Sequence, residues 1–271
     1  MSISAEAPLP IDIDWELAKE RVQDSGRKLV GLMRSVVDPS RTAIGYWTIG
    51  DLSAHLTQVY EGFPVMAAGG KSPVPDEVKM AQTYDDYLRE NPERDPASLA
   101  DRVEKSTIQL LEQVQNMSPQ DSISWHGGIE IPIVVLLAIV VDEAIVHGWD
   151  IAQAEGREAR IAPVDAQLSI KGLTAVSPHF LTPEGKAARV SYGIKLRGDG
   201  RLTVRLANGE ATVSSYDEGP VDCRITASPV DFLMVGAGRI GMWGPIAKGK
   251  IVAYGRKPWK GLNFTKYFRD P

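Results

Sequence analysis

Two residues that could do chemistry lie in the most apolar part of this 271-residue sequence. Glu143 and His147 are four residues apart, so on a helix both side chains lie on one face, one turn from each other. Burying a carboxylate in such surroundings costs several kcal/mol unless a partner compensates its charge. A metal ion would compensate it, because neutral imidazole and carboxylate oxygen are both good ligands for Zn²⁺ and similar cations.

A third candidate ligand, His55, lies on an earlier predicted helix whose inner face is otherwise apolar. The spacing of Glu143 and His147 is by itself equally compatible with a buried ion pair that holds no metal. A second inward histidine favours the metal, because helical bundles commonly build such sites from facing helices. Three protein ligands leave coordination positions open, which is typical of a catalytic site, and the set suits Fe²⁺ or Ni²⁺ as well as Zn²⁺.

Three other polar residues are weaker candidates. Asp150, three residues after His147, could orient that imidazole through its second ring nitrogen or could equally form a hydrogen bond along the helix. His126 lies in a glycine-flanked turn and could line the mouth of a pocket, but we expect an ordinary loop histidine. We assign no role to His179, which follows Pro178.

The elements that must position these residues are mainly helical. Asp12 or Asp14 can cap a first helix, and Thr48 and Asp51 have the spacing of a capping box at the start of the helix that carries His55. The apolar run at 131–141 is too short to span a bilayer and predicts a helix buried on nearly every side. Apolar periodicity predicts helices at about 14–37, 48–68, 76–89, 96–117, 131–154 and 164–180.

The pattern changes after a predicted linker at 182–185. Apolar and polar residues then alternate, and the turn signals Gly198-Asp199-Gly200 and Asn208-Gly209 separate the alternating segments. A short helix at 228–235 and an amphipathic helix at 259–268 are expected among the strands. Strands are predicted at 189–196, 201–206, 210–215, 221–227 and 250–254.

Composition excludes several classes of protein. A formal net charge of -5 without a basic block argues against nucleic-acid binding. The single cysteine, Cys223, excludes an internal disulfide and fits a reducing, cytoplasmic compartment. The N-terminus lacks the pattern of a secretory signal, so we expect a cytoplasmic protein with no membrane partner.

The first part of the sequence resembles the DinB-like, mycothiol-dependent maleylpyruvate isomerase family. The resemblance covers roughly residues 12–182 and depends on the segments 47–56 and 142–154, with the core Glu143-Ala144-Ile145-Val146-His147-Gly148-Trp149-Asp150. It implies a four-helix bundle in which His55, Glu143 and His147 hold zinc. It also implies that the metal binds the sulfur of a small thiol, mycothiol.

The remaining part, 186–271, is similar to a sterol-carrier-protein-2-type α+β domain at 221–233 and 249–255. The expected fold is therefore a DinB-like bundle at 12–182 followed by this smaller domain. The resemblance implies that the second domain can contribute a cation for an acidic substrate. Arg239, Lys250 and Arg256 are candidates, although each is more typical of a solvated surface charge.

These features predict an enzyme in which a metal-bound small thiol attacks a small electrophile. Cys223 lies in a predicted strand and should be buried and inert, so the nucleophile must come from a cosubstrate. Addition and later expulsion of the thiolate would give cis–trans isomerisation, whereas addition alone would give S-transfer. Two alternatives remain open: a carrier of an apolar ligand with a non-catalytic bundle, and a metal-dependent hydrolase.

Overall fold

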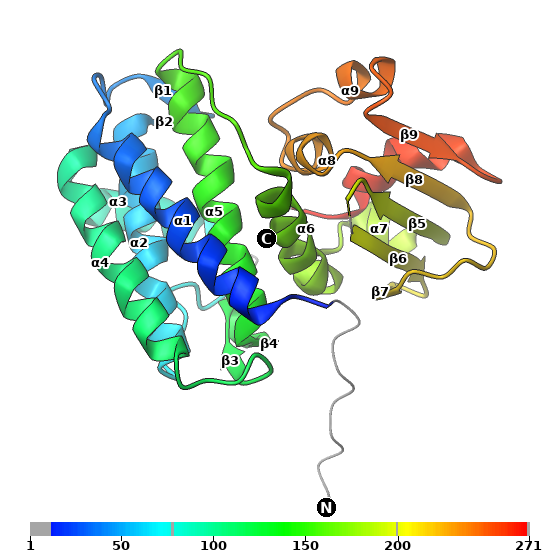
Figure 1. The fold of residues 1–271 in the computed structure, drawn as a ribbon, viewed down its shortest axis with the longest axis horizontal. Coiled ribbons are helices and arrows are strands. Elements are labelled where there is room, and N and C mark those ends of the chain that lie inside the picture. The colour runs from blue at the N-terminus through cyan, green and yellow to red at the C-terminus, as the bar shows by residue number, and fades with distance from the viewer. Residues whose placement is uncertain (1–11, 77–78, 199, 270–271) are drawn as a thin grey trace, which may run out of the picture. The chain divides into compact units, whose positions relative to one another are not determined.

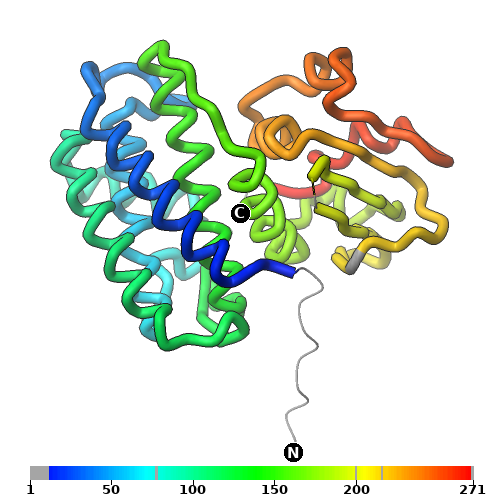
Figure 2. Tube along the Cα trace, in the orientation of Figure 1, coloured from blue at the N-terminus to red at the C-terminus, as the bar shows by residue number. Residues whose placement is uncertain are grey.

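The computed structural model describes residues 12–76, 79–198 and 200–269. Two compact units make up the chain: a helical unit, Asp14–Gly172, and a sheet unit that begins at Leu173. The trace in Figure 2 passes through the long helices of the first unit, coloured blue to green, before it enters the part of the sheet unit that is coloured yellow to red. The predicted order of a helical part followed by an α+β part is confirmed.

Four long helices form the bundle of the helical unit. Helix α1 packs against α4 and α5, and α2 packs against the same two helices, so the four enclose one core. A shorter helix, α3, packs on α2, and α6 follows the bundle and continues to the start of the sheet unit. The bounds are α1 Trp15–Arg34, α2 Ile49–Ala67, α3 Met80–Glu90, α4 Pro96–Val114, α5 Ile133–Ala154 and α6 Pro163–Val176 (Figure 1).

The helices begin where side chains can accept hydrogen bonds from unpaired backbone N–H groups. Asp14 accepts from the N–H of Leu17, and Thr48 and Asp51 form the predicted capping box. Helix α1 ends at Arg34 rather than at Val37, because Val37 is 82% exposed and has no core to join.

Helix α5 is the central element of the bundle. Every residue from Ile133 to Val141 is at most 5% exposed, so the apolar run is surrounded by protein as predicted. None of the described helices combines the length and the apolar character needed to cross a membrane.

Two small hairpins were not predicted. Strand β1, Thr42–Ile44, pairs with β2, Trp47–Thr48, and β3, Ser122–Ser124, pairs with β4, Glu130–Pro132. Strands of two or three residues are too short to show a period of two, which is why the sequence pattern missed them. The first hairpin places Trp47 immediately before α2.

The sheet unit contains one mixed sheet of five strands in the order β7-β6-β5-β8-β9. All neighbours are antiparallel except β5 and β8, which are parallel. The predicted turn between β6 and β7 is confirmed, with Asn208 at φ 56° and Gly209 at φ 86°. The strands are β5 Val190–Leu196, β6 Gly200–Ala207, β7 Glu210–Ser215, β8 Cys223–Ala227 and β9 Ile251–Tyr254.

Two predictions for this unit are wrong. The segment taken as a linker contains a short helix, α7 (Pro183–Ala187), capped by the hydroxyl of Thr182. The last helix is a 3₁₀ segment, η4 (Pro258–Tyr267), and its Gly261 lies so close to the sheet that a Cβ there would be 2.7 Å from that of Ala253. The other short elements are η3 Ser177–Phe180, α8 Pro229–Gly236 and α9 Trp243–Ala247, of which α9 was not predicted.

Candidate metal centre

Helices α2 and α5 bring the three predicted ligands together. His55 comes from α2, Glu143 and His147 come from α5, and one ligand atom of each lies within 4.8 Å of the other two. The Nε2 of His147 is 3.5 Å from a carboxylate oxygen of Glu143, and the rings of His55 and His147 have centroids 5.5 Å apart. Residues 88 positions apart in sequence thus form one polar cluster inside the bundle.

His55 has the electrostatic state that a metal ligand needs. It is 5% exposed, and burial together with the nearby His147 and His126 holds its pKa well below 6.5. The imidazole is therefore neutral at neutral pH, with a lone pair free for coordination. Its Nδ1 is buried and has no hydrogen-bond partner among the residues that the structure describes.

Asp150 is placed to orient His147. Its carboxylate oxygen is 3.0 Å from the Nδ1 of His147, and the residue is only 3% exposed. With Nδ1–H donating to this carboxylate, Nε2 keeps its lone pair on the side of Glu143. A carboxylate behind a coordinating imidazole is a common arrangement around metals in proteins.

Aromatic side chains enclose His55. Tyr84 of α3 meets the imidazole edge-on at 4.5 Å between centroids, and Trp47 lies at 5.0 Å. The indole N–H of Trp47 donates to Asp85 at 3.3 Å, and the hydroxyl of Tyr46 donates to the same carboxylate at 2.8 Å. Asp85 therefore holds Trp47, one of the two aromatic residues that pack against His55.

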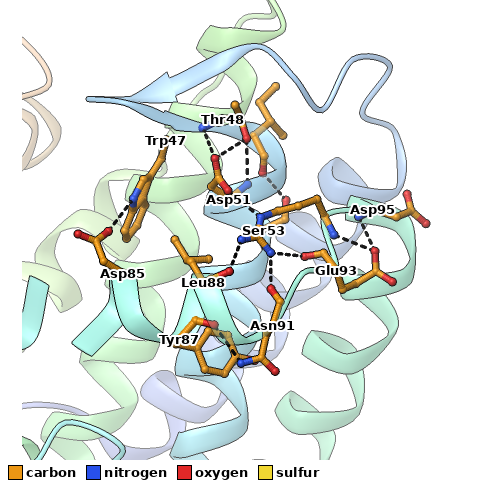
Figure 3. A network of polar contacts seen from close by, with 12 residues as sticks. Trp47, Thr48, Asp51, Ser53, Asp85, Tyr87, Leu88, Asn91, Glu93 and Asp95 are labelled. Atoms are coloured by element: carbon orange, nitrogen blue, oxygen red, sulfur yellow. Dashed lines mark hydrogen bonds and ion pairs between the residues drawn. The ribbon is translucent and has the colours of Figure 1, made fainter. Parts of the chain in front are cut away.

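A second polar network holds the start of α2. Arg94 donates to Asp51 at 2.7 Å and to the carbonyl oxygens of Leu88 and Asn91 at 2.6 and 2.5 Å. Figure 3 shows these three acceptor residues around one network of polar contacts. Gly50 makes this possible, because a Cβ there would meet the carbonyl oxygen of Arg94 at 2.9 Å. The helix that carries His55 is thereby fixed to the connection between α3 and α4.

The expectation that His126 is an ordinary loop histidine is wrong. It is 6% exposed, stacks on Trp125 at 4.4 Å, and burial lowers its pKa to about 4. Its Nδ1 is 2.7 Å from the hydroxyl of Ser72, and its Nε2 is 3.4 Å from that of Tyr84. No local sequence pattern predicted this cluster. Ser72 lies in the connection between α2 and α3, and Tyr84 lies in α3. His179, by contrast, is exposed.

The candidate cations of the second domain all have partners within the sheet unit. Each one donates to a carbonyl or carboxylate of a nearby segment, so none is a fully solvated charge. Arg239 donates to the carbonyl of Ala237, Lys250 to Asp231 at 3.2 Å, and Arg256 to Asp222 at 2.6 Å.

Cys223 is fully buried in β8, as predicted. Burial raises the pKa of its thiol, which makes the reactive thiolate rarer still at neutral pH.

Comparison with known proteins supports the family assignment. Residues 26–152 match the model of the mycothiol maleylpyruvate isomerase N-terminal domain. Among curated proteins, no sequence matches this chain.

Solved structures match over most of the length. The crystal structure of the mycothiol-dependent maleylpyruvate isomerase has 15% sequence identity and a TM-score of 0.55, with 89% of this chain and 93% of that chain covered. A histidine-to-alanine mutant of that enzyme gives 12% identity and a TM-score of 0.56 over the same shares. A ubiquinone synthesis protein, UbiJ-SCP2, matches 40% of this chain and 92% of its own, with 16% identity and a TM-score of 0.29.

The predicted fold class, a helical bundle followed by a smaller α+β domain, is thus confirmed. Residues 26–152 match the model of the mycothiol maleylpyruvate isomerase N-terminal domain, and the chain has the fold of the mycothiol-dependent maleylpyruvate isomerase.

Proposed function

We propose that this protein is a thiol-dependent isomerase or S-transferase that binds one divalent metal ion, Zn²⁺, through His55, Glu143 and His147. One observation carries the proposal: ligand atoms of these three residues, from two helices, lie within 4.8 Å of one another. The family match and the fold support mycothiol as the thiol cosubstrate and a small electrophile as its target.

The residues present fit a metal ion. Two imidazoles and a carboxylate form a typical donor set for Zn²⁺. The buried Nδ1 of His55 needs a partner that no described residue provides, and burial keeps this ring neutral, as coordination requires. Three protein ligands would leave a position for an exogenous ligand.

The chemistry follows from what this chain has and lacks. A metal ion bound there would lower the pKa of a coordinated thiol and so supply a thiolate near neutral pH. Asp150 holds the proton on Nδ1 of His147 and orients the ring, while Tyr84 and Trp47 close the cluster around His55. The buried Cys223 cannot serve as the nucleophile, so the thiol must enter as a cosubstrate.

The same site serves two reactions. The thiolate adds to one carbon of a conjugated double bond, and the electron pair of that bond moves to the adjoining carbonyl group. Rotation about the new single bond followed by expulsion of the thiolate returns the double bond in the other geometry, which is isomerisation. If a proton is taken up instead, the sulfur stays attached and the product is an S-conjugate.

Removal of one ligand tests the proposal. We expect Glu143→Gln to lose metal during dialysis and to lose at least ~10²-fold in kcat/KM, because an uncharged amide is a poor Zn²⁺ ligand. Metal content measured by elemental analysis, and turnover of maleylpyruvate with mycothiol, bacillithiol or glutathione, are the readouts. His179→Ala is the matched control, because His179 is an exposed histidine outside the cluster.

Full metal occupancy in Glu143→Gln would disprove the ligand set. Turnover that persists in wild-type protein without any thiol would favour a metal-dependent hydrolase instead.

The carrier alternative has one structural observation in its favour. The sheet unit contains an apolar pocket of about 340 Å³ lined by residues that include Phe232, Met242, Trp243, Trp259 and Phe264. Trp243 and Trp259 are 68% and 60% exposed at this pocket. Binding of an apolar ligand, with no metal bound and no thiol-dependent turnover, would favour this function over the enzyme.

A further inference from the structure

One buried polar group of α2 is not explained by the metal ligands. Gln58 follows His55 by three residues and precedes Gly62 by four, so the three residues lie along one stripe of α2. Gln58 is only 7% exposed. Its Oε1 is buried and has no hydrogen-bond partner among the described residues.

A row of contacts covers the same stripe. At one end, the ring of Tyr84 packs edge-on against His55 at 4.5 Å, and its hydroxyl lies 3.4 Å from His126. His126 in turn is 2.7 Å from the hydroxyl of Ser72.

At the other end of the stripe the contact is made by Pro73, the residue after Ser72. Pro73 packs against α2 so closely that a Cβ on Gly62 would lie 3.2 Å from its ring. Because the cover touches the stripe at His55 and at Gly62, Gln58 is placed on α2 between the metal cluster and the residue that Pro73 covers.

A buried acceptor without a partner is uncommon and costly. More than nine in ten buried polar groups in proteins are hydrogen-bonded, and an unpaired one costs about 1–3 kcal/mol. The unpaired Nδ1 of His55 is accounted for by the proposed metal. Gln58 needs a different partner, one that brings a hydrogen-bond donor next to the metal centre.

We infer that the carboxamide oxygen of Gln58 accepts a hydrogen bond from a hydroxyl or amide N–H of the small molecule bound at the metal centre, and so helps to select it. The inference deepens the proposed function and rests on it. A hydroxyl or amide N–H can belong to the thiol cosubstrate or to the electrophile, and separate Michaelis constants distinguish these two sources.

The test replaces the amide with an apolar side chain of similar length. For Gln58→Met in the metal-loaded protein, we expect KM for either mycothiol or maleylpyruvate to rise about 10-fold, the loss of one hydrogen bond of roughly 1.4 kcal/mol. Calorimetric titration with mycothiol should show the same loss if the thiol is the partner. Metal content should not change, and the melting temperature should stay the same or rise, because an unpaired buried acceptor has been removed.

Two further variants make the result decisive. Gln58→Asn keeps an uncharged carboxamide on the same stripe and should restore part of the affinity lost in Gln58→Met. Gln109→Met makes the same substitution at an exposed glutamine of α4 and should leave both KM values unchanged.

The inference and the proposed function fail in different ways. Wild-type KM values in Gln58→Met, with normal metal content, would overturn the inference alone and indicate that an ordered water is the partner. A large drop in melting temperature would also overturn it, since Gln58 would then be a structural residue. Absence of metal and of thiol-dependent turnover in the wild-type protein would overturn the proposed function, and the inference with it.

Discussion

The two units of this protein treat buried polar groups in opposite ways. In the sheet unit, Asp222 is 8% exposed and accepts hydrogen bonds from the backbone N–H of Ser191, from Arg256 and from Lys257, so its charge is fully compensated within the protein. In the helical unit, His55 and Gln58 are equally buried, yet each keeps an atom without a partner among the described residues.

Whether a buried polar group has a partner within the protein distinguishes a structural role from a functional one. A polar group whose partners are all supplied by the fold stabilises that fold. A group that the fold buries and leaves unpaired costs stability and is retained where a ligand provides the missing partner. By this criterion Arg256, a candidate for substrate binding, has a structural partner in Asp222. The unpaired Nδ1 of His55 and Oε1 of Gln58 on α2 are the atoms for which we propose ligand partners.

The largest expected difference between the two units is their loss of stability at low pH. His126 has a pKa of about 4, below its ordinary 6.5, so the unfolded chain takes up a proton first and the helical unit should lose roughly 3 kcal/mol as pH falls from about 6.5 to about 4. Asp222 has a pKa of about 2, because Arg256 and Lys257 outweigh the effect of burial, so its contribution is complete above about pH 3.8 and lost only below it.

The helical unit should therefore weaken before the sheet unit does. Urea unfolding followed by circular dichroism at several pH values measures the effect. His126→Asn, which does not titrate, should reduce it, and the buried His55, whose pKa is also lowered, should account for a remaining part. An unchanged pH dependence in that variant would show that His126 is not the group responsible.

The next test compares two isosteric substitutions. Asp222→Asn should cost about 2–3 kcal/mol of unfolding free energy, because it removes a charge that accepts several hydrogen bonds. Gln58→Met, the variant described above, should change the stability of the metal-free protein by less than about 1 kcal/mol. Equal losses in the two variants, measured by urea titration, would remove the distinction between the two kinds of buried group.

The smallest expected effect concerns the aromatic residues around His55. Asp85→Ala frees the indole of Trp47 and the hydroxyl of Tyr46, and we expect metal affinity to fall about 10-fold with little change in melting temperature. Competition with a chromogenic chelator measures it. Asp86→Ala is the matched control, since Asp86 forms an ion pair with the exposed Arg89 and with no other residue in the described part of the chain. An equal loss there would exclude positioning as the cause.

The helices and the grouping of His55, Glu143 and His147 could be predicted from the sequence because both depend on local signals. Asp14 and Thr48 mark helix starts, and Glu143 and His147 interrupt an apolar helix at a spacing that the helix itself dictates. His55 could be added because it interrupts a second apolar face.

The surroundings of the ligands could not be predicted in the same way. Ser72, Tyr84 and His126 meet through contacts between residues 42 and 54 positions apart, and no local pattern encodes such contacts. The close approach of η4 to β9 at Gly261 is likewise a contact between segments. Tertiary packing decides both features, and periodicity does not report it.

The candidate metal ligands and the residues that cover them come from different elements, and this has a consequence for how the site can vary. The ligands sit on α2 and α5, whose backbones are fixed by the bundle core, whereas the covering residues come from the connection before α3, from α3 itself and from the β3–β4 hairpin. Mutations in these covering segments leave the backbones of α2 and α5 in place, because the bundle core holds them. The lining of the proposed site can therefore vary while the helices that carry the three candidate ligands stay the same.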